Sequence, residues 1–412
     1  MSGELRVAYL VSRYPALSHV FIRREIEALR RLGVVVETAS LRTPSEAELL
    51  TEADRLERAS TYYIQPVRPL ALLREHLLIG LGSPLRYLQT LHKALLHRRA
   101  GARGLLWALF HFAEAIQLAA ELGRRGVEHI HSHFANAGGT VGLLASEVLG
   151  VGWSVTLHGL SDFGDPEGQR LAEKIGEARF VACVSEHGRA QALRFGGPAA
   201  AGHTHVVRCG LPANAFRDRA RGDEAGEGTD PLRIICVGRL APEKGHLGLL
   251  EALASARSDG LEARLTLVGE GPERPEIEAR IAALGIGEHV DLPGALAGPA
   301  LRDRLADSDL FVLSSFMEGL PVTLMEALAV GTPAVVPGLS GIPELVRQDE
   351  EGWLYTAGRF DSLADALLRA GKERGVLAAM GERGRERVRQ LHDIDEQAAT
   401  LRGLLAAAAG RG

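Results

Sequence analysis

Apolar and polar positions follow two regular spacings at the start of the chain. Residues 5–11 form a short apolar run, and residues 21–33 carry apolar side chains at helical spacing. Residues 34–40 then return to an apolar run. This order predicts a strand, a helix and a second strand, and strands joined through a helix pair in parallel with a right-handed crossover. The pattern therefore predicts a parallel α/β sheet.

The same alternation returns twice farther along the chain. In the first half, four more apolar runs are predicted strands: 129–135, 153–159, 179–185 and 203–210. In the second half, six runs are predicted strands: 232–238, 264–270, 289–294, 309–315, 332–338 and 352–355. Segments of helical spacing separate them, so each half is expected to form its own sheet.

A polar segment separates the two series of strands. Residues 217–231 are charged, contain glycine and lack apolar periodicity, which is typical of a linker. We therefore predict an α/β protein of two doubly wound, Rossmann-like domains that face each other across a cleft. The predicted first domain spans 1–215, and a linker at 216–231 joins it to the second domain, 232–390. A final helix at 391–412 is expected to cross back to the first domain.

Residues 66–122 break this alternation, because they hold apolar and basic segments without a clear strand. From Arg68 to Arg103 there are seven basic residues and one acid, Glu75. Amphipathic helices with clustered arginine favour an anionic lipid surface, so one interpretation is peripheral contact of 68–103 with an anionic membrane. The other interpretation is a solvated helical insertion that covers one side of the first domain. No run of about 18 uncharged apolar residues occurs, so no membrane span is expected.

Composition adds limits to this picture. The chain has 412 residues, too many for one domain of about 150 residues. Its cysteines, Cys183, Cys209 and Cys236, form no CxxC pair, which indicates buried thiols in a reducing compartment. The N-terminus has no basic segment followed by a long apolar run, so we expect a cytoplasmic protein.

The charges are distributed unevenly between the halves of the chain. Residues 1–209 carry 24 Lys and Arg against 20 Asp and Glu, and residues 210–412 carry 23 against 32. The halves either face different partners or differ by chance.

Candidate site residues are found just after several predicted strands. In parallel sheets of this kind, ligands bind at the carboxyl ends of the strands. After the strand at 309–315, residues 318–344 hold two turns, each followed by a predicted helix start. A helix N-terminus offers free N–H groups and a positive dipole end, which suit phosphate or sugar oxygens. Glu326 falls in an otherwise apolar helix, where a carboxylate needs a partner. A ribose or sugar diol, solvent or an arginine would each satisfy it.

Two cations follow the strand at 232–238. Arg239 leaves the end of this strand, and Lys244 precedes the next helix. Two cations at such a junction suit a diphosphate without a metal, although a solvated surface loop has the same composition. Residues 267–274 begin like a dinucleotide fingerprint but have Arg274 where the third glycine belongs. A nicotinamide or flavin enzyme is therefore not expected.

Two loops of the first half carry further candidates. His158 lies at the end of a predicted strand, so its imidazole is expected at the carboxyl edge, in a catalytic or a structural role. Asp162 follows in the same loop, and Ser18, after the first strand, is either a phosphate or acceptor contact or a helix cap. No metal site is expected, because the histidines of 131–134 lack a third ligand and the acids of 307–309 precede a strand.

Together these motifs resemble family-4 retaining glycosyltransferases of the GT-B fold. The second half carries VGRL…EKG at 237–245, EGLP…E with Glu318 and Glu326 eight residues apart, and SGIPELV at 340–346. The first half resembles the subgroup that builds bacterial exopolysaccharide, including colanic-acid-type transferases, in the runs YPALSHVFIRREIEAL, HSHFANAGG, TLHGLSDF, VACVSEHGRAQAL and VVRCGLP.

The resemblance implies roles for the matching residues. Arg239 and Lys244 would hold the donor diphosphate, and Glu326 would bind the ribose hydroxyls. His158 and Glu318 would be the catalytic residues that contact the transferred sugar. The remaining assignments are backbone contacts to sugar or phosphate at Gly319, Leu320 and Pro321, the nucleobase near Gly269, Pro293 and Gly294, and an acceptor or phosphate loop with Ser18 and Asp162.

The chain departs from the family pattern in its first half. Ser18 and His19 stand where many members have two glycines. Ser161 stands where many members have the aspartate of HGxD, and Asp162 comes one residue later. The phosphate contacts of the first loop and the role of Asp162 are therefore left open by the resemblance.

The resemblance implies a retaining glycosyltransferase that moves a sugar from a UDP- or GDP-sugar to a glycan, lipid-linked or small-molecule acceptor in bacterial polysaccharide biosynthesis. The first domain would bind the acceptor and the second the donor. Apart from the nucleotide-sugar donor, no cofactor, metal or nucleic-acid partner is expected. Membrane contact would place the cytoplasmic protein at the inner face of the plasma membrane. The alternatives are a nucleotide-sugar epimerase of the same fold and a non-catalytic sugar-nucleotide-binding subunit.

Overall fold

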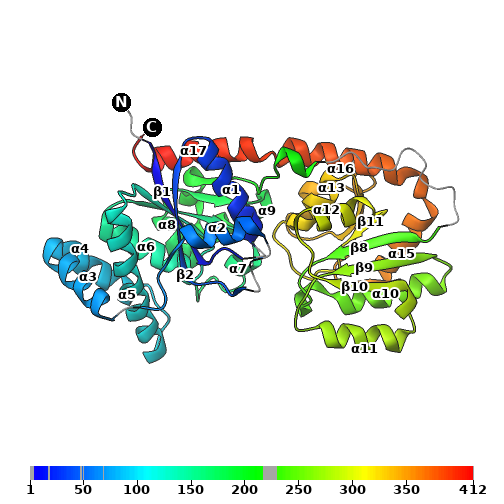
Figure 1. Cartoon of the computed structure of the whole chain (residues 1–412), viewed down its shortest axis with the longest axis horizontal. Helices are drawn as coiled ribbons and strands as arrows, with labels where there is room; N and C mark the ends of the chain where they lie inside the picture. Colours follow the sequence, from blue (N-terminus) through cyan, green and yellow to red (C-terminus); the bar gives the residue numbers. More distant parts are fainter. Residues whose placement is uncertain are drawn as a thin grey trace. The chain divides into compact units, whose positions relative to one another are not determined.

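The computed structural model divides the chain into two compact units (Figure 1). The first comprises Met1–Gly210 and Ile394–Gly412, and the second comprises Leu211–Asp393. The structure describes residues 4–16, 19–46, 49, 51–67, 69–216 and 230–411. The predicted linker at 216–231 lies almost entirely outside the described residues. Each unit is built on one parallel sheet and is described by itself.

The sheet of the first unit has seven parallel strands in the order β3-β2-β1-β4-β5-β6-β7. Their bounds are β1 Arg6–Arg13, β2 Val35–Arg42, β3 Tyr62–Tyr63, β4 His129–His133, β5 Gly152–Leu157, β6 Val181–Cys183 and β7 Thr204–Val206. The chain builds the sheet outward from β1 to β3 and then returns beside β1 with β4. The order of the strands therefore reverses between β1 and β4.

Helices cover both faces of this sheet. Their bounds are α1 Val20–Arg31, α2 Glu52–Ser60, α3 Pro69–Gly82, α4 Pro84–Leu96, α5 Ala102–Arg124, α6 Ala137–Leu149, α7 Leu160–Phe163, α8 Leu171–Glu177, α9 Glu186–Gly196 and α17 Ile394–Ala408. Alternate residues of β1 point to opposite faces. Val7 and Tyr9 join the cluster under α1 and α17, whereas Ala8 and Leu10 join the cluster under α5 and α6.

The final helix α17 belongs to the first unit because its apolar face packs there. Its buried residues Ile394, Ala398, Leu401 and Leu405 recur at helical spacing and join the cluster that contains Val7 and Tyr9. The first unit therefore ends at Gly210 and resumes at residue 394, whereas the sequence pattern put these boundaries at 215 and 391.

The sheet of the second unit has six parallel strands in the order β10-β9-β8-β11-β12-β13. The strands are β8 Leu232–Val237, β9 Ala263–Val268, β10 Val290–Gly294, β11 Leu310–Val312, β12 Ala334–Pro337 and β13 Gly352–Tyr355. The helices are α10 His246–Ser258, α11 Arg274–Leu284, α12 Gly298–Ala306, α13 Val322–Ala329, α14 Ile342–Leu345, α15 Phe360–Lys372 and α16 Leu377–Leu391. All six sequence-predicted strands of this half are present, each within a few residues of its expected bounds.

One helix among the described residues, α5, is long and apolar enough to cross a membrane by length and composition. Its second half is part of the protein core, because Phe112, Ala115, Ile116 and Leu118 are buried in the cluster beneath the sheet. Helix α5 is therefore a core helix in its second half, and its first turns lie at the surface of the first unit.

Candidate functional site

The strand order of the second unit reverses between β8 and β11, and the candidate donor residues follow these two strands. Arg239 and Lys244 lie after β8, and Glu318 lies after β11. In open parallel sheets, ligands bind where the strand order reverses, at the carboxyl ends of the strands. Residues 74 positions apart in the sequence thus meet at the place where the fold offers a binding site.

Lys244 and Glu318 form the central ion pair of this site. Lys244 Nζ lies 2.6 Å from Glu318 Oε1, and their side chains are 23% and 9% exposed. The same carboxylate oxygen accepts a hydrogen bond of 2.6 Å from Ser315 Oγ. A charged hydrogen bond with this little solvent holds the ammonium at a defined position. The carboxylate thus fixes the cation, which is a role that the sequence did not predict for Glu318.

Arg239 also contacts a carboxylate of its own loop, that of Glu243. In contrast to Lys244, its guanidinium side chain is 65% exposed. The loop itself is fixed to the β11 side by two hydrogen bonds, from Phe316 N–H to Glu243 O (2.9 Å) and from Ser314 Oγ to Lys244 O (2.8 Å). The site therefore has one ordered cation and one cation that is accessible to an anionic ligand.

The N-terminus of α13 adjoins the same place. Pro321 precedes the helix, and no side chain among the described residues caps it. The amides of Val322 and Thr323 therefore belong to the free donors of a helix start. Thr323 Oγ1 lies 3.5 Å from Val237 O, at the end of β8. The first turn of α13 is therefore beside the loop of residues 239–244, which carries Arg239 and Lys244 and is called the cation loop below. Backbone donors and cations at one edge suit the oxygens of a phosphate group.

The predicted contacts at Gly319, Leu320 and Glu326 lie around this helix start. Gly319 O accepts a hydrogen bond from Gly341 N–H (3.2 Å), which joins the two turns that the sequence singled out. Leu320 is buried, and Glu326 is half-buried on α13. The second turn leads into α14, a helix of only four residues. The predicted pair of helix starts therefore consists of one regular helix and one single turn.

The predicted nucleobase residues meet at the ends of the next strands. Gly269 N–H donates to Gly294 O over 2.9 Å, and Pro293 precedes Gly294 in β10. Gly269 has φ +153°, and a Cβ atom there would lie 1.8 Å from Gly238 O. Only glycine permits this close approach of β9 to the start of the cation loop.

The first unit holds a group of neighbouring polar side chains from the middle of β1 and the carboxyl ends of β4 and β5. His158 Nε2 lies 2.9 Å from His133 Nδ1, and His133 Nε2 lies 3.3 Å from Glu25 Oε1 on α1. Tyr9 OH donates to the same glutamate oxygen over 2.7 Å. The catalytic histidine expected from the sequence is thus the end member of a series that starts at Tyr9.

The carboxylate of Glu25 lies 3.3 Å from His133 Nε2 without forming a hydrogen bond, so it acts on the protonation of the two imidazoles through its charge. It favours the His133 tautomer that carries a proton on Nε2, so that His133 Nδ1 accepts from His158 Nε2–H. Burial, with His133 and His19 nearby, lowers the pKa of His158 well below 6.5. His158 is therefore neutral at neutral pH, and its Nδ1 is left as a hydrogen-bond acceptor.

Asp162 differs from its expected role as an acceptor or phosphate contact. It is fully buried, and its carboxylate oxygens accept from Ala135 N–H (2.6 Å) and His158 N–H (2.7 Å). Burial raises its pKa to about 6. Because both oxygens are engaged inside the protein, Asp162 is not available to an acceptor; it fixes the backbone of His158 instead. Ser18 lies outside the described residues.

Three ligand atoms of Glu25, His131 and His133 lie within 4.8 Å of one another, close enough for a metal site. Both ring nitrogens of His131 are already engaged, however, by Ser154 Oγ at 2.7 Å and Thr156 Oγ1 at 2.8 Å. Hydrogen bonds therefore account for both ring nitrogens of His131, whereas His133 Nε2 lies 3.3 Å from Glu25 Oε1 with no hydrogen bond among the described residues. The sequence signal for this group was the HSHF run, which without the position of Glu25 indicated only a weak metal motif.

The comparisons with known proteins show the family of the second half of the chain and the fold of the whole. Residues 219–387 match the family model described as glycosyl transferases group 1. The chain contains a domain of this family and is a glycosyltransferase, as the sequence motifs predicted. Its two Rossmann-like sheets are those of the GT-B fold.

Two relatives and one solved structure are representative. The chain is 28% identical over 95% of its length, and 97% of the relative's, to a protein of Escherichia coli (strain K12) named as the colanic acid biosynthesis glycosyltransferase WcaL. It is 35% identical to the amylovoran biosynthesis glycosyltransferase AmsK of Erwinia amylovora over 40% of this chain and 41% of that one. The crystal structure of Anabaena HepE in complex with UDP has a TM-score of 0.72, with 18% identity over 98% of this chain and 100% of that chain.

Proposed function

We propose that the chain is a retaining family-4 glycosyltransferase of bacterial polysaccharide biosynthesis. It transfers a sugar from a UDP- or GDP-sugar to a glycan or lipid-linked acceptor, without a metal ion. The observation that carries this proposal is the Lys244–Glu318 pair beside Arg239 and the α13 N-terminus, where the strand order of the second unit reverses. This is an arrangement of fixed positive groups suited to a diphosphate.

The cations and the helix start serve the leaving group in this proposal. When the bond between the anomeric carbon and the diphosphate oxygen breaks, the electron pair leaves with the diphosphate. Lys244, Arg239 and the free N–H groups of α13 stabilise the charge that develops there. Glu326, half-buried on the same helix, accepts hydrogen bonds from the two ribose hydroxyls.

The acceptor then completes the transfer on the same face of the sugar. Its hydroxyl oxygen forms the new bond to the anomeric carbon, and its proton passes to the departing phosphate oxygen, so the configuration is retained. His158 Nδ1, a neutral acceptor in the tautomer described above, takes a hydrogen bond from a hydroxyl of the transferred sugar. Glu318 holds Lys244 in position throughout.

Relatives support the substrate classes. The similar proteins of E. coli and Erwinia amylovora are named for colanic acid and amylovoran biosynthesis. Structures of Anabaena HepE contain UDP and UDP-glucose, with about one fifth of residues identical to this chain. The names of the first two proteins support a polysaccharide product for this chain, and the ligands of the third support a nucleotide-sugar donor.

The proposal is tested with the purified chain and a panel of UDP-, GDP-, ADP- and dTDP-sugars. A thermal-shift screen identifies the donor, and mass spectrometry with NMR of the product identifies the linkage and the anomeric configuration. We expect one donor to raise the Tm and to give a product with retained configuration in the presence of EDTA.

The matched control is the variant pair Lys244→Ala and Lys372→Ala, since Lys372 is the other lysine of the second unit and lies exposed on α15. Lys244→Ala should lose both the thermal shift and the product, and Lys372→Ala should keep them. A product of inverted configuration would reject the retaining step. An isomerised donor formed without acceptor would assign the chain to the epimerases of this fold.

A further inference from the structure

We propose that α3, α4 and the first half of α5 form a membrane-docking surface whose leucine side chains enter an anionic bilayer. We call residues 69–110 of these helices the docking face. In Figure 1 the three helices lie side by side at one edge of the first unit. The inference rests on side chains of the first unit that have no part in the proposed nucleotide-sugar site of the second unit, so it stands independently of the proposed function.

The outward side of α3 is apolar, which is the reverse of an ordinary surface helix. Leu70, Leu73, Leu77 and Leu81 recur at helical spacing and are all exposed, Leu70 by 85% and Leu81 by 81%. The inward positions of the helix include Glu75, which is buried and pairs with Arg124 at 3.1 Å. In water this orientation exposes the leucines and costs free energy, whereas in a lipid surface it is the favourable one.

The second helix continues the same pattern. Leu85, Leu88 and Leu96 of α4 are exposed at helical spacing. Its inward side is held by Tyr87, whose hydroxyl lies 2.8 Å from His76 Nδ1 on α3 and whose ring packs edge-on against Phe112 of α5. These contacts fix the helices to one another, so the leucines of both belong to one ordered surface.

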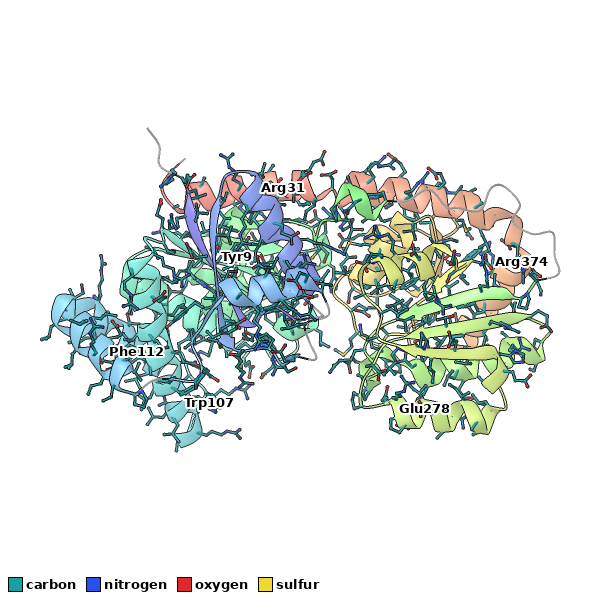
Figure 2. The ribbon with its side chains drawn as sticks, in the orientation of Figure 1. Tyr9, Arg31, Trp107, Phe112, Glu278 and Arg374 are labelled. Atoms are coloured by element: carbon teal, nitrogen blue, oxygen red, sulfur yellow. The ribbon has the colours of Figure 1, made fainter. Side chains whose placement is uncertain are left out.

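The first turns of α5 complete the face. Leu106, Trp107 and Phe110 are exposed there, whereas Phe112 and the turns that follow are buried. Figure 2 shows Trp107 near the outer end of α5 and Phe112 closer to α3 and α4. A tryptophan beside leucines is typical of the interface between headgroups and acyl chains.

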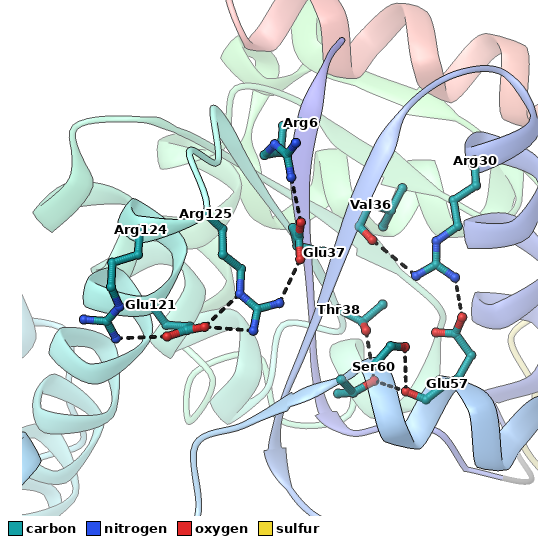
Figure 3. A network of polar contacts seen from close by, with 11 residues as sticks. Arg6, Arg30, Val36, Glu37, Thr38, Glu57, Ser60, Glu121, Arg124 and Arg125 are labelled. Atoms are coloured by element: carbon teal, nitrogen blue, oxygen red, sulfur yellow. Dashed lines mark hydrogen bonds and ion pairs between the residues drawn. The ribbon is translucent and has the colours of Figure 1, made fainter.

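The other end of α5 is anchored in the first unit, as Figure 3 shows. Arg125 Nη1 lies 2.8 Å from Glu37 Oε2 on β2, and Glu121 on α5 accepts a hydrogen bond from Arg125 Nε–H over 2.8 Å. Glu37 also pairs with Arg6 of β1 at 2.8 Å. A helix fixed in this way does not cross the bilayer, so its outer turns can only dip into one leaflet.

The charges beside the leucines identify the occupant as an anionic bilayer. Arg74, Arg86 and Arg103 are exposed on the docking face, and the single acid of the segment, Glu75, is turned inward. Exposed cations around an apolar surface match the headgroups and acyl chains of anionic lipid together. Elsewhere among the described residues, exposed large hydrophobic side chains occur singly or as one pair, so the concentration is specific to this face.

Vesicle flotation of the full-length chain tests the proposal. The variant Leu70→Gln/Leu77→Gln/Leu81→Gln removes three outward leucines and keeps good helix formers at exposed positions. Leu56→Gln is the matched control, because Leu56 is 64% exposed on α2, outside the docking face. On vesicles of phosphatidylcholine with an equal amount of phosphatidylglycerol, the wild type and Leu56→Gln should float. The triple variant should bind at least about tenfold more weakly.

Three results would overturn the proposal. In the first, the wild type remains in the bottom fraction, unbound, with both anionic and neutral vesicles. In the second, the triple variant floats as well as the wild type. Alternatively, the wild type is a dimer that becomes monomeric in the triple variant while neither binds vesicles, which assigns the face to a second copy of the chain. Weaker flotation of the wild type on pure phosphatidylcholine is expected, and it measures the share of the arginines in binding.

Discussion

His133 Nδ1 lies 2.9 Å from His158 Nε2, and Glu25 Oε1 lies 3.3 Å from the opposite nitrogen of His133. The imidazole that we assign to the transferred sugar is thus oriented by a second imidazole and a carboxylate. His133 is fully buried, so this arrangement does not depend on solvent. It links α1, β4 and β5 at the carboxyl edge of the sheet, where a bound sugar would require a fixed acceptor.

Replacing His133 by Ala should lower kcat about tenfold to a hundredfold, as large as the loss found when a group that orients a metal-binding histidine is removed. The donor Kd should change little, because the residues that we propose to bind the diphosphate lie in the other unit. Glu25→Gln should give a smaller loss, since the amide keeps the shape but no longer favours one tautomer. Steady-state kinetics and donor titration measure both effects.

His187→Ala, an exposed histidine on α9, is the matched control and should keep the wild-type kcat. His133→Asn should restore part of the activity, because its amide can still bond to His158 Nε2. Equal losses in kcat and in Tm for all His133 variants would mean that the residue only stabilises the fold.

Much of the fold follows from the sequence because apolar periodicity is local. The strands at 232–238 and 264–270 are present as β8 and β9, and the helix at 21–33 is present as α1. The two-residue strand β3 was not predicted, since Tyr62–Tyr63 is too short for periodicity to detect. Pairing order comes from contacts distant in sequence, so the position of β4 beside β1 needed the structure.

The candidate site likewise has residues that the sequence could identify and contacts that only the structure shows. Arg239, Lys244 and Glu318 could be named from motifs, because loops at strand ends carry the ligand contacts in parallel sheets. The ion pair between Lys244 and Glu318 could not be predicted from the sequence, because the two residues are 74 positions apart and either side chain could have faced solvent. Glu25 lies within the run YPALSHVFIRREIEAL, but no role could be assigned to it from the sequence, because only the folding of α1 over the sheet brings its carboxylate to His133. The orientation of the docking face was likewise hidden, because the apolar pattern of α3 does not reveal which side is covered.

The ion pair of Lys244 and Glu318 leads to a double-mutant cycle. Lys244→Ala should lower kcat/KM by about 10²- to 10³-fold, the typical loss of one fixed group that stabilises developing charge. Glu318→Gln should have a large effect if the carboxylate fixes the ammonium, and the double variant should be no worse than Lys244→Ala. Additive losses in the cycle would instead give Glu318 a separate contact with the sugar.

Stability should fall as the pH decreases from 7 to 5. Burial lowers the pKa of a set of histidines below 6.5, to about 3 or 4 where values are defined: His97, His111, His129, His131, His158 and His246. Between these values and 6.5 the unfolded chain binds protons that the native chain does not, so stability is lost as the pH falls, by up to about 1.4 kcal/mol per histidine and pH unit.

Two buried carboxyls act in the opposite direction. Burial raises the pKa of Asp162 to about 6 and that of Glu114 to about 7, so the native chain binds protons there that the unfolded chain releases. The histidines outnumber them, and the net effect is a Tm that falls below pH 6.5. His131→Gln should be less stable at pH 7 but lose less of its Tm on acidification. A Tm that stays level from pH 7 to 5 would contradict the assignment of neutral buried histidines.

The close approach of Gly269 to Gly238 predicts a specific sensitivity in the second unit. In Gly269→Ala the new methyl group would meet Gly238 O at 1.8 Å. Neither backbone segment can move away easily, because Gly238 N–H donates to Val268 O (3.0 Å) and Gly269 N–H donates to Gly294 O (2.9 Å).

Gly260→Ala is the control, since Gly260 also has positive φ (+94°) but no atom within 4 Å of the new methyl group. It should cost only about 1–2 kcal/mol of unfolding free energy, the price of the left-handed backbone. Gly269→Ala should cost more and should also weaken donor binding, because the strand ends at the cation loop would separate. Urea unfolding and donor titration decide this, and equal behaviour of the two variants would show that the β9 end is free to move and is not part of the donor site.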